Sequence, residues 1–245
     1  MDTPFTPRAR RLALAMTVAF LPLSVPAAGR ASPMEGEAIA HTVATDATPS
    51  AMLAALAAVE RDWSHISFEV TDHDARVQAM AALADQASQL ASQYPGHAEP
   101  LIWQALALGS LAGLKGGMGA LSLAREARTL LETAGRLDYR AVGGAVPTSL
   151  GSLYYKVPGF PLSFGDDDKA RRYLEEGLAI NPDGLDANYF YGDFLFEQGE
   201  YRKAAEVLAH GLDVPPTPDR PVWDTGRRVE IRALLKRAQQ KLAAG

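Results

Sequence analysis

Three consecutive acidic residues, Asp166 to Asp168, form a candidate group of metal ligands. A calcium loop places its oxygen ligands at alternate positions and closes with a glutamate, whereas these aspartates are adjacent and are followed by a basic stretch from Lys169. Acidic side chains in the first turn of a helix accept hydrogen bonds from free backbone N–H groups and complement the helix dipole. We interpret the three aspartates as the start of a helix, and a cation site is the alternative.

The remaining polar residues do not match the catalytic patterns that can be recognised in a sequence. The five histidines include no HExxH pattern, and Asp72-His73-Asp74 is interpreted as a helix start. No Gly-x-Ser-x-Gly elbow occurs, and the glycine-rich segment 113–119 lacks the Gly-Lys-Ser/Thr ending of a phosphate loop. The sequence therefore predicts no metal, no cofactor and no enzyme activity. A buried acid–base cluster in a deep pocket would argue for an enzyme.

Aromatic side chains surround an irregular segment, Val157-Pro158-Gly159-Phe160-Pro161, within a helical region. Two interpretations stay open: a packed loop that seals the fold, or a rigid lip that contacts a peptide or a small apolar ligand. Tyrosine and asparagine on a later predicted helix suit peptide recognition as well. We hypothesise that five side chains form one continuous groove lined by aromatic rings and an amide: Tyr154, Tyr155, Phe160, Asn188 and Tyr191. The alternative is that the same side chains pack between the repeats as part of the core.

Composition excludes several classes of protein. Of the 245 residues, 47% are hydrophobic and 22% are charged, which fits a globular chain and neither a disordered one nor a polytopic membrane protein. The net charge of −5 argues against nucleic-acid binding, which needs a basic surface. The absence of cysteine excludes disulfides, cysteine-ligated metals and a lipid-modified cysteine.

The first residues have the layout of a secretory signal peptide. Three arginines precede an uncharged stretch from Leu12 to Val25, and small residues follow at Ala27 and Ala28. The stretch is too short for a good spanning helix, so no stable membrane anchor is expected. We predict a signal peptide at 1–27, a flexible spacer at 28–49 and a folded domain at 50–245. Export through the Sec route to the bacterial periplasm follows from this order.

The folded domain is predicted to be all-α, because apolar residues recur at helical spacing from Ser50 onward. Segments 168–182 and 202–216 are similar to each other at an offset of 34, which is the period of the tetratricopeptide repeat. The clearest repeats are predicted at 151–184 and 185–218. The fold class is therefore a tetratricopeptide-like stack of antiparallel helical hairpins with a C-terminal capping helix, 222–243.

The repeat assigns packing roles to particular residues. Gly192 is expected where the first helix of a hairpin meets the second, and Ala204 and Leu208 are expected as the small and large contacts on the second helix. In the earlier repeat, the segment 157–161 is expected to interrupt the first helix. The segment 98–139 is expected to form a further, degenerate hairpin. On the capping helix, the basic residues from Arg227 to Lys241 are expected to lie mostly on the solvated face, and a docking face for an acidic partner is the alternative.

The stretch 152–242 resembles a group of exported bacterial tetratricopeptide-repeat proteins without an assigned reaction. The resemblance is carried by Tyr154-Tyr155-Lys156-Val157-Pro158-Gly159, Phe164-Gly165-Asp166-Asp167, Asn181-Pro182-Asp183-Gly184, Asn188-Tyr189-Phe190-Tyr191-Gly192 and Asp219-Arg220-Pro221. More distantly, the layout is similar to the periplasmic T component of TRAP-type transporters. That likeness implies an accessory subunit that pairs with a solute-binding protein.

The sequence thus favours a non-catalytic protein-binding or scaffolding module in the periplasm, whose partner is another protein or a peptide segment. An accessory role in solute transport is the alternative within the same class. An enzyme is the alternative from a different class.

Overall fold

The computed structural model describes residues 47–244, so the predicted signal peptide 1–27 and residues 28–46 of the predicted spacer lie outside the described part. The described chain is helical from end to end, as predicted for an all-α protein. Its helices are α1 (Ala47–Phe68), α2 (His73–Gln93), α3 (Ala98–Lys115), α4 (Gly117–Leu137), α5 (Ala141–Lys156), α6 (Asp167–Ile180), α7 (Leu185–Glu197), α8 (Tyr201–Asp213) and α9 (Pro221–Ala243). Helix α1 begins three residues before the predicted start of the domain at residue 50.

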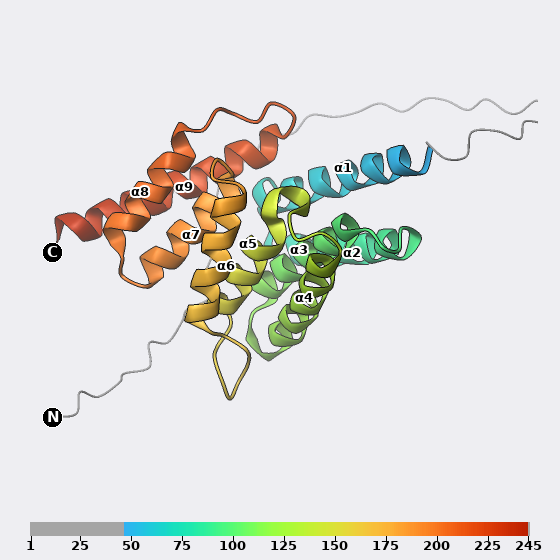
Figure 1. The fold of residues 1–245 in the computed structure, drawn as a ribbon, viewed down its shortest axis with the longest axis horizontal. Coiled ribbons are helices and arrows are strands. Elements are labelled where there is room, and N and C mark those ends of the chain that lie inside the picture. The colour runs from blue at the N-terminus through green and yellow to red at the C-terminus, as the bar shows by residue number, and fades with distance from the viewer. Residues whose placement is uncertain (1–46, 245) are drawn as a thin grey trace, which may run out of the picture.

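Consecutive helices pair as antiparallel hairpins, α1 with α2, α3 with α4, α5 with α6 and α7 with α8 (Figure 1). The hairpin α3/α4 occupies the predicted degenerate unit 98–139. Local signals in the sequence set two of the helix starts: Asp72 Oδ1 accepts from Ala75 N–H at 2.8 Å, and Asp166 Oδ1 accepts from Lys169 N–H at 3.0 Å. Asp166 therefore caps α6, and the N–H of Lys169 lowers the pKa of its carboxyl group.

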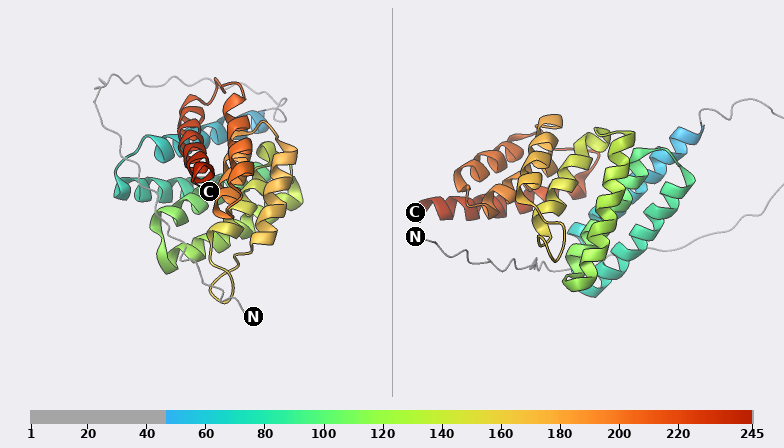
Figure 2. Two further views of the ribbon diagram at one scale, coloured as in Figure 1. Left: turned by 90° about the vertical axis from the view of Figure 1, so that its left-hand side faces the viewer. Right: turned by 60° about the horizontal axis from the view of Figure 1, so that its bottom comes forward.

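The first helices of the hairpins form a ring that α9 completes. Each of α1, α3, α5 and α7 contacts the next, α7 contacts α9, and α9 returns to contact α1. The stack therefore closes on itself, and Figure 2 shows α9 running alongside the hairpin α7/α8 toward the blue N-terminal helix. A capping helix that only covers the last hairpin was predicted; α9 does pack on α8, and it also joins the two ends of the array.

The contact between α1 and α9 depends on a glycine. A Cβ at Gly226 would lie 2.3 Å from Cγ of Phe68, so only a residue without a side chain lets the two helices approach this closely. An ion pair supports the same contact, with Nε of Arg220 2.6 Å from Oε1 of Glu60. Trp223 lies beside it, under the guanidinium of Arg220 at 3.9 Å.

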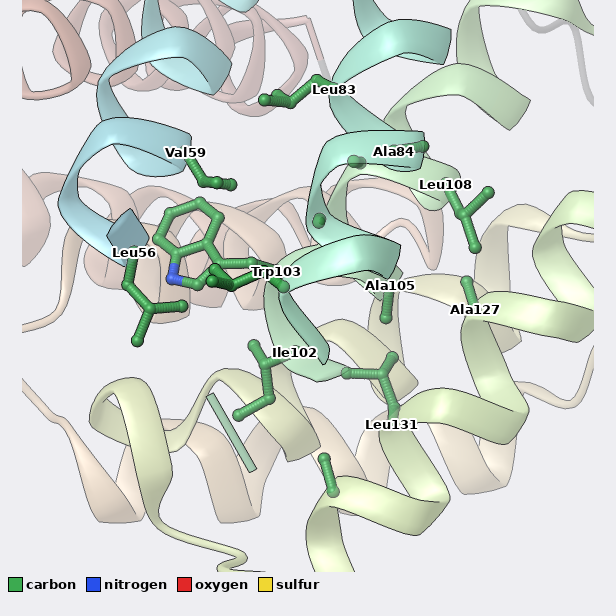
Figure 3. Packing of buried hydrophobic residues seen from close by; sticks show 14 of the residues in the cluster. Leu56, Val59, Leu83, Ala84, Ile102, Trp103, Ala105, Leu108, Ala127 and Leu131 are labelled. Carbon is green, nitrogen blue, oxygen red and sulfur yellow. The ribbon is translucent and has the colours of Figure 1, made fainter. Parts of the chain in front are cut away.

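The core of the N-terminal half is built around Trp103. Figure 3 shows its indole facing Leu56 and Val59 of α1, while Ile102 and Leu131 fill the next layer toward α4. A second tryptophan, Trp63, donates its indole N–H to Ser110 Oγ at 3.0 Å and so ties α1 to α3. These side chains fix the positions of the helices that form the first half of the ring.

The second half of the fold follows the predicted repeat, with one correction of register. In α7/α8 a Cβ at Gly192 would lie 2.6 Å from Leu208, so these helices meet where the repeat predicts. In α5/α6 the equivalent pair is Gly151 and Leu174, also at 2.6 Å. The first helix of the earlier repeat is therefore not interrupted at 157–161. The first helix of this repeat is α5. It lies nearer the N-terminus than the repeat predicted, because the loop 157–166 that follows it is longer than the equivalent turn 198–200.

The prediction that the basic residues of α9 face solvent is wrong for two of them. Arg227 and Arg228 are both buried, whereas Arg232, Lys236, Arg237 and Lys241 are exposed as expected. Arg228 donates to both carboxylate oxygens of Asp224 and to the carbonyls of Leu212, Val214 and Pro215. It therefore satisfies the carbonyl groups at the end of α8, which the helix itself leaves without partners.

Helices that are both long and apolar enough to cross a membrane do not occur between residues 47 and 244.

Candidate functional site

A cavity of about 710 Å³ lies inside the ring of helices. Its volume falls in the range of pockets that hold small molecules. Most side chains that line it are apolar, and α1, α3, α5, α7 and α9 supply most of them. The aromatic lining residues are Trp63, Phe68, Trp103, Tyr155, Tyr189, Phe190 and Trp223.

A buried charged cluster lies on the side of the cavity formed by α7 and α9. Arg227 Nε is 2.7 Å from Asp186 Oδ1, and Arg227 Nη1 is 2.5 Å from Glu230 Oε2. The guanidinium also lies over the ring of Tyr189 at 4.4 Å. Burial raises the pKa of Glu230 although Arg227 opposes that effect, and the two carboxylates keep Arg227 charged against its own burial.

A second charged group joins α5 to α7. Tyr155 Oη donates to Asp193 Oδ2 at 2.8 Å, and the ammonium group of Lys156 pairs with the same carboxylate. Burial raises the pKa of Tyr155 well above its usual value, so the phenol remains protonated and a hydrogen-bond donor. These contacts hold α5 and α7 side by side in the ring.

These acidic and basic groups are arranged as ion pairs, which neutralise one another. Within residues 47–244, the side chains of His65, His73 and His210 contact the carboxylates of Glu69, Asp74 and Asp183. In the same range, no group of three or more His, Asp or Glu lies together as a metal site would require. A buried acid–base cluster is thus present, and its groups are held in ion pairs.

The structure does not bring the five predicted groove residues to one open surface. Tyr154 is buried against Phe164 and Tyr173, with ring centroids 5.4 and 5.6 Å apart. Tyr155 is only 2% exposed, although its side chain reaches the wall of the cavity. The expected continuous groove is therefore replaced by separate environments.

The two residues of the later helix also have structural partners. Asn188 is 1% exposed, and its side-chain amide donates to the carbonyls of Pro182 at 2.7 Å and Gly184 at 2.9 Å. It fixes the turn before α7. Tyr191 donates to Glu175 at 3.0 Å, and partial burial together with that carboxylate raises its pKa to about 12.

Helix geometry explains the separation. Adjacent residues of a helix point about 100° apart, so Tyr154 and Tyr155 cannot face the same surface. Tyr154 faces α6 and the loop that follows α5, while Tyr155 faces α7 and the cavity.

The fifth residue, Phe160, is 94% exposed. It belongs to the loop between α5 and α6, which projects from the lower edge of the molecule in Figure 1. At its tip, loop 157–166 neither packs against the core nor lines the cavity. Its base is held by backbone hydrogen bonds from Gly165 to Pro158 at 2.9 Å and from Asp166 to Tyr154 at 2.9 Å. A Cβ at Gly165 would lie 2.2 Å from the carbonyl oxygen of Val157, so the base closes only around glycine.

Two arginine side chains of α4 hold the loop in place as well. Arg125 Nη2 donates to the carbonyl of Leu162 at 3.1 Å, and Arg128 lies over the ring of Phe164 at 4.4 Å. Phe160 is thus an exposed aromatic side chain on a fixed support. Leu162, 62% exposed, lies two residues away on the same loop.

Sequence reasoning missed the charged cluster and the tryptophans of the cavity. A signal for Arg227 was present: continuing the apolar positions of α9 backward from Ile231 by four residues gives Arg227 and then Trp223. No local signal marks Trp63 or Trp103 as cavity residues, because the cavity exists only when α9 closes the ring.

Comparison with known proteins agrees with the repeat found in the sequence. Residues 162–225 match the family model described as tetratricopeptide repeat. A thermophilic TPR protein from Thermus thermophilus is a structural neighbour, with 19% sequence identity and a TM-score of 0.46 over 68% of this chain and 84% of that one. No curated protein matches the chain.

The described chain is thus a stack of helical hairpins, and its residues 162–225 are similar to the tetratricopeptide repeat. Repeats of this type usually serve protein–protein interactions rather than catalysis.

Proposed function

We propose that the protein is a non-catalytic binding module of the bacterial periplasm, and that it contacts another protein through the tip of loop 157–166. The observation that carries the proposal is Phe160, a large apolar side chain left 94% exposed on a loop whose base is fixed. Aromatic anchors on pre-organised supports carry much of the binding energy in protein interfaces, because little conformational freedom is lost on binding.

A photo-crosslinking amino acid at position 160 tests this proposal in the living cell. We expect one discrete adduct, because the tip inserts into a partner. The matched control is the same amino acid at Leu53, which is 59% exposed on α1 far from the loop in the sequence. Equal labelling at both positions, or no adduct at 160, would contradict the assignment of the loop.

The substitution Phe160→Ala is expected to remove the adduct partner from affinity purifications and to change the free energy of unfolding by no more than about 0.5 kcal/mol, because the side chain touches little of its own chain. Chemical denaturation of the wild-type protein and the variant measures the second quantity. A large loss of stability would mean that the loop is part of the core.

The periplasmic location rests on the order of basic, apolar and small residues in the first 28 positions. We expect mass spectrometry of the protein from a periplasmic extract to give a mature N-terminus at Ala28 or Gly29. Recovery of the full-length chain from the cytoplasm would contradict the proposed periplasmic location.

An accessory role in solute transport is a second candidate, favoured by the likeness of residues 152–242 to the T component of TRAP-type systems. It requires that the partner at loop 157–166 be a solute-binding protein. Identification of the crosslinked protein separates this role from that of a general assembly factor.

A further inference from the structure

The cavity inside the ring contains a cation without a counter-ion. Four lysine or arginine side chains line it: Arg76, Lys156, Arg220 and Arg227. Three of these have acidic partners, as described above. Within residues 47–244, Arg76 has no ion pair, and its Nε is buried without a hydrogen-bond partner.

Arg76 is partly buried and has few hydrogen-bond partners among the described residues. Its Nη2 donates to the carbonyl of Ser67 at 3.3 Å, a single long hydrogen bond for a group with five donors. Ser67 lies at the end of α1 beside Phe68, which forms the closing contact with α9. Arg76 therefore lies where the apolar wall meets the point at which the ring closes.

We infer that the cavity is a binding site for an anionic amphiphile, a molecule with an apolar chain and one carboxylate, which Arg76 neutralises. The aromatic side chains that line the cavity can contact the apolar chain of such a molecule. The cavity volume of about 710 Å³ lies in the range of pockets that hold small molecules. A guanidinium binds a carboxylate through two parallel hydrogen bonds, which uses the donors that the protein leaves free. Val157 and Pro158 at the base of loop 157–166 line the cavity, but the exposed tip with Phe160 does not, so this site does not depend on the proposed protein partner.

Isothermal titration calorimetry of the purified protein with dodecanoate tests the inference, with dodecanol as the uncharged probe. We expect dodecanoate to bind with one molecule per chain and dodecanol to bind more weakly. The variant Arg76→Met keeps an apolar chain of similar length and removes the charge. It is expected to weaken dodecanoate at least tenfold and to leave dodecanol unchanged.

Two further variants separate the cavity from other surfaces. Arg61→Met removes an exposed cation on α1 that does not line the cavity, and it should leave both affinities unchanged. Gly109 lines the cavity on α3, and a Cβ there would meet only Leu153, at 4.0 Å, so Gly109→Leu should narrow the cavity without a clash at Cβ. We expect it to weaken binding of both probes while the melting temperature stays near that of the wild type.

The inference is overturned if dodecanoate does not bind, if Arg76→Met weakens both probes equally, or if the folded Gly109→Leu variant binds as well as the wild type. The last outcome would place the amphiphile on the outer surface. None of these results depends on whether Phe160 contacts a partner.

Discussion

The substitution Arg228→Met should lower the free energy of unfolding by about 3–5 kcal/mol, because it leaves a buried carboxylate without its counter-ion. Asp224 is the carboxylate concerned; both side chains of the pair are 9% exposed, and Arg228 Nε is 2.8 Å from Asp224 Oδ2. Burial by itself would raise the pKa of Asp224, but Arg228 and the N–H of Thr217 hold it below its usual range. Without Arg228, the carboxylate of Asp224 either stays charged and buried without a counter-ion or takes up a proton.

The loss is enlarged by the carbonyl groups that Arg228 also satisfies. Leu212, Val214 and Pro215 accept from its guanidinium at 2.8 to 3.1 Å, and methionine offers them no donor. Urea denaturation measures the difference in unfolding free energy. The matched control is Arg232→Met, one turn farther along α9 and exposed, which should stay within about 0.5 kcal/mol of the wild type. Similar losses for the two variants would show that Arg228 is solvated in solution.

The second large effect is expected at the repeated leucines of the two C-terminal hairpins. Leu174 and Leu208 are almost completely buried, and each fills the space left by a glycine on the facing helix. Leu174→Ala and Leu208→Ala should each cost about 2–5 kcal/mol, because a cavity remains where the helices cannot move closer. The similarity of the two losses is itself part of the prediction, since the residues occupy equivalent positions in the two repeats.

Leu178 and Leu212 provide the controls for this pair. They are related by the same offset, lie one turn farther along α6 and α8, and are only partly buried. Replacing either with alanine should cost less than replacing its buried neighbour, because less apolar surface is removed from contact. A larger loss at Leu178 or Leu212 would mean that the register of the repeat is wrong.

The sequence determined the parts of this fold that depend on neighbours along the chain. The spacing of apolar residues predicted the helices, and the internal repeat predicted the two C-terminal hairpins. The run of aspartates 166–168 predicted the start of α6, and the structure identifies Asp166 as the cap. The contact of Gly192 with Leu208 followed from the same repeat. These features are local, because a helix, its cap and its hairpin partner are specified within a few tens of residues.

Local reasoning was insufficient for the groove hypothesis. It placed Tyr154, Tyr155, Phe160, Asn188 and Tyr191 on one surface because segment 154–164 was expected to lie next to the predicted helix 185–197. Which face each residue presents is fixed by helix phase and by the length of loop 157–166, and a shift of one residue turns a side chain by about 100°. As a result, Phe160 is exposed on the loop, whereas Asn188 is buried and holds the turn before α7 by hydrogen bonds.

Only the tertiary structure decided that the array closes into a ring. The closing contacts join residues far apart in the sequence, Phe68 with Gly226 and Glu60 with Arg220. The sequence shows each of these residues only as one aromatic, one glycine or one charge on its own helix. These residues come into contact only because the curvature of the successive hairpins brings α9 back to α1. That closure encloses the cavity, buries Arg227 among aromatic rings, and leaves Arg76 at the wall without an acid to pair with among the residues that the structure describes.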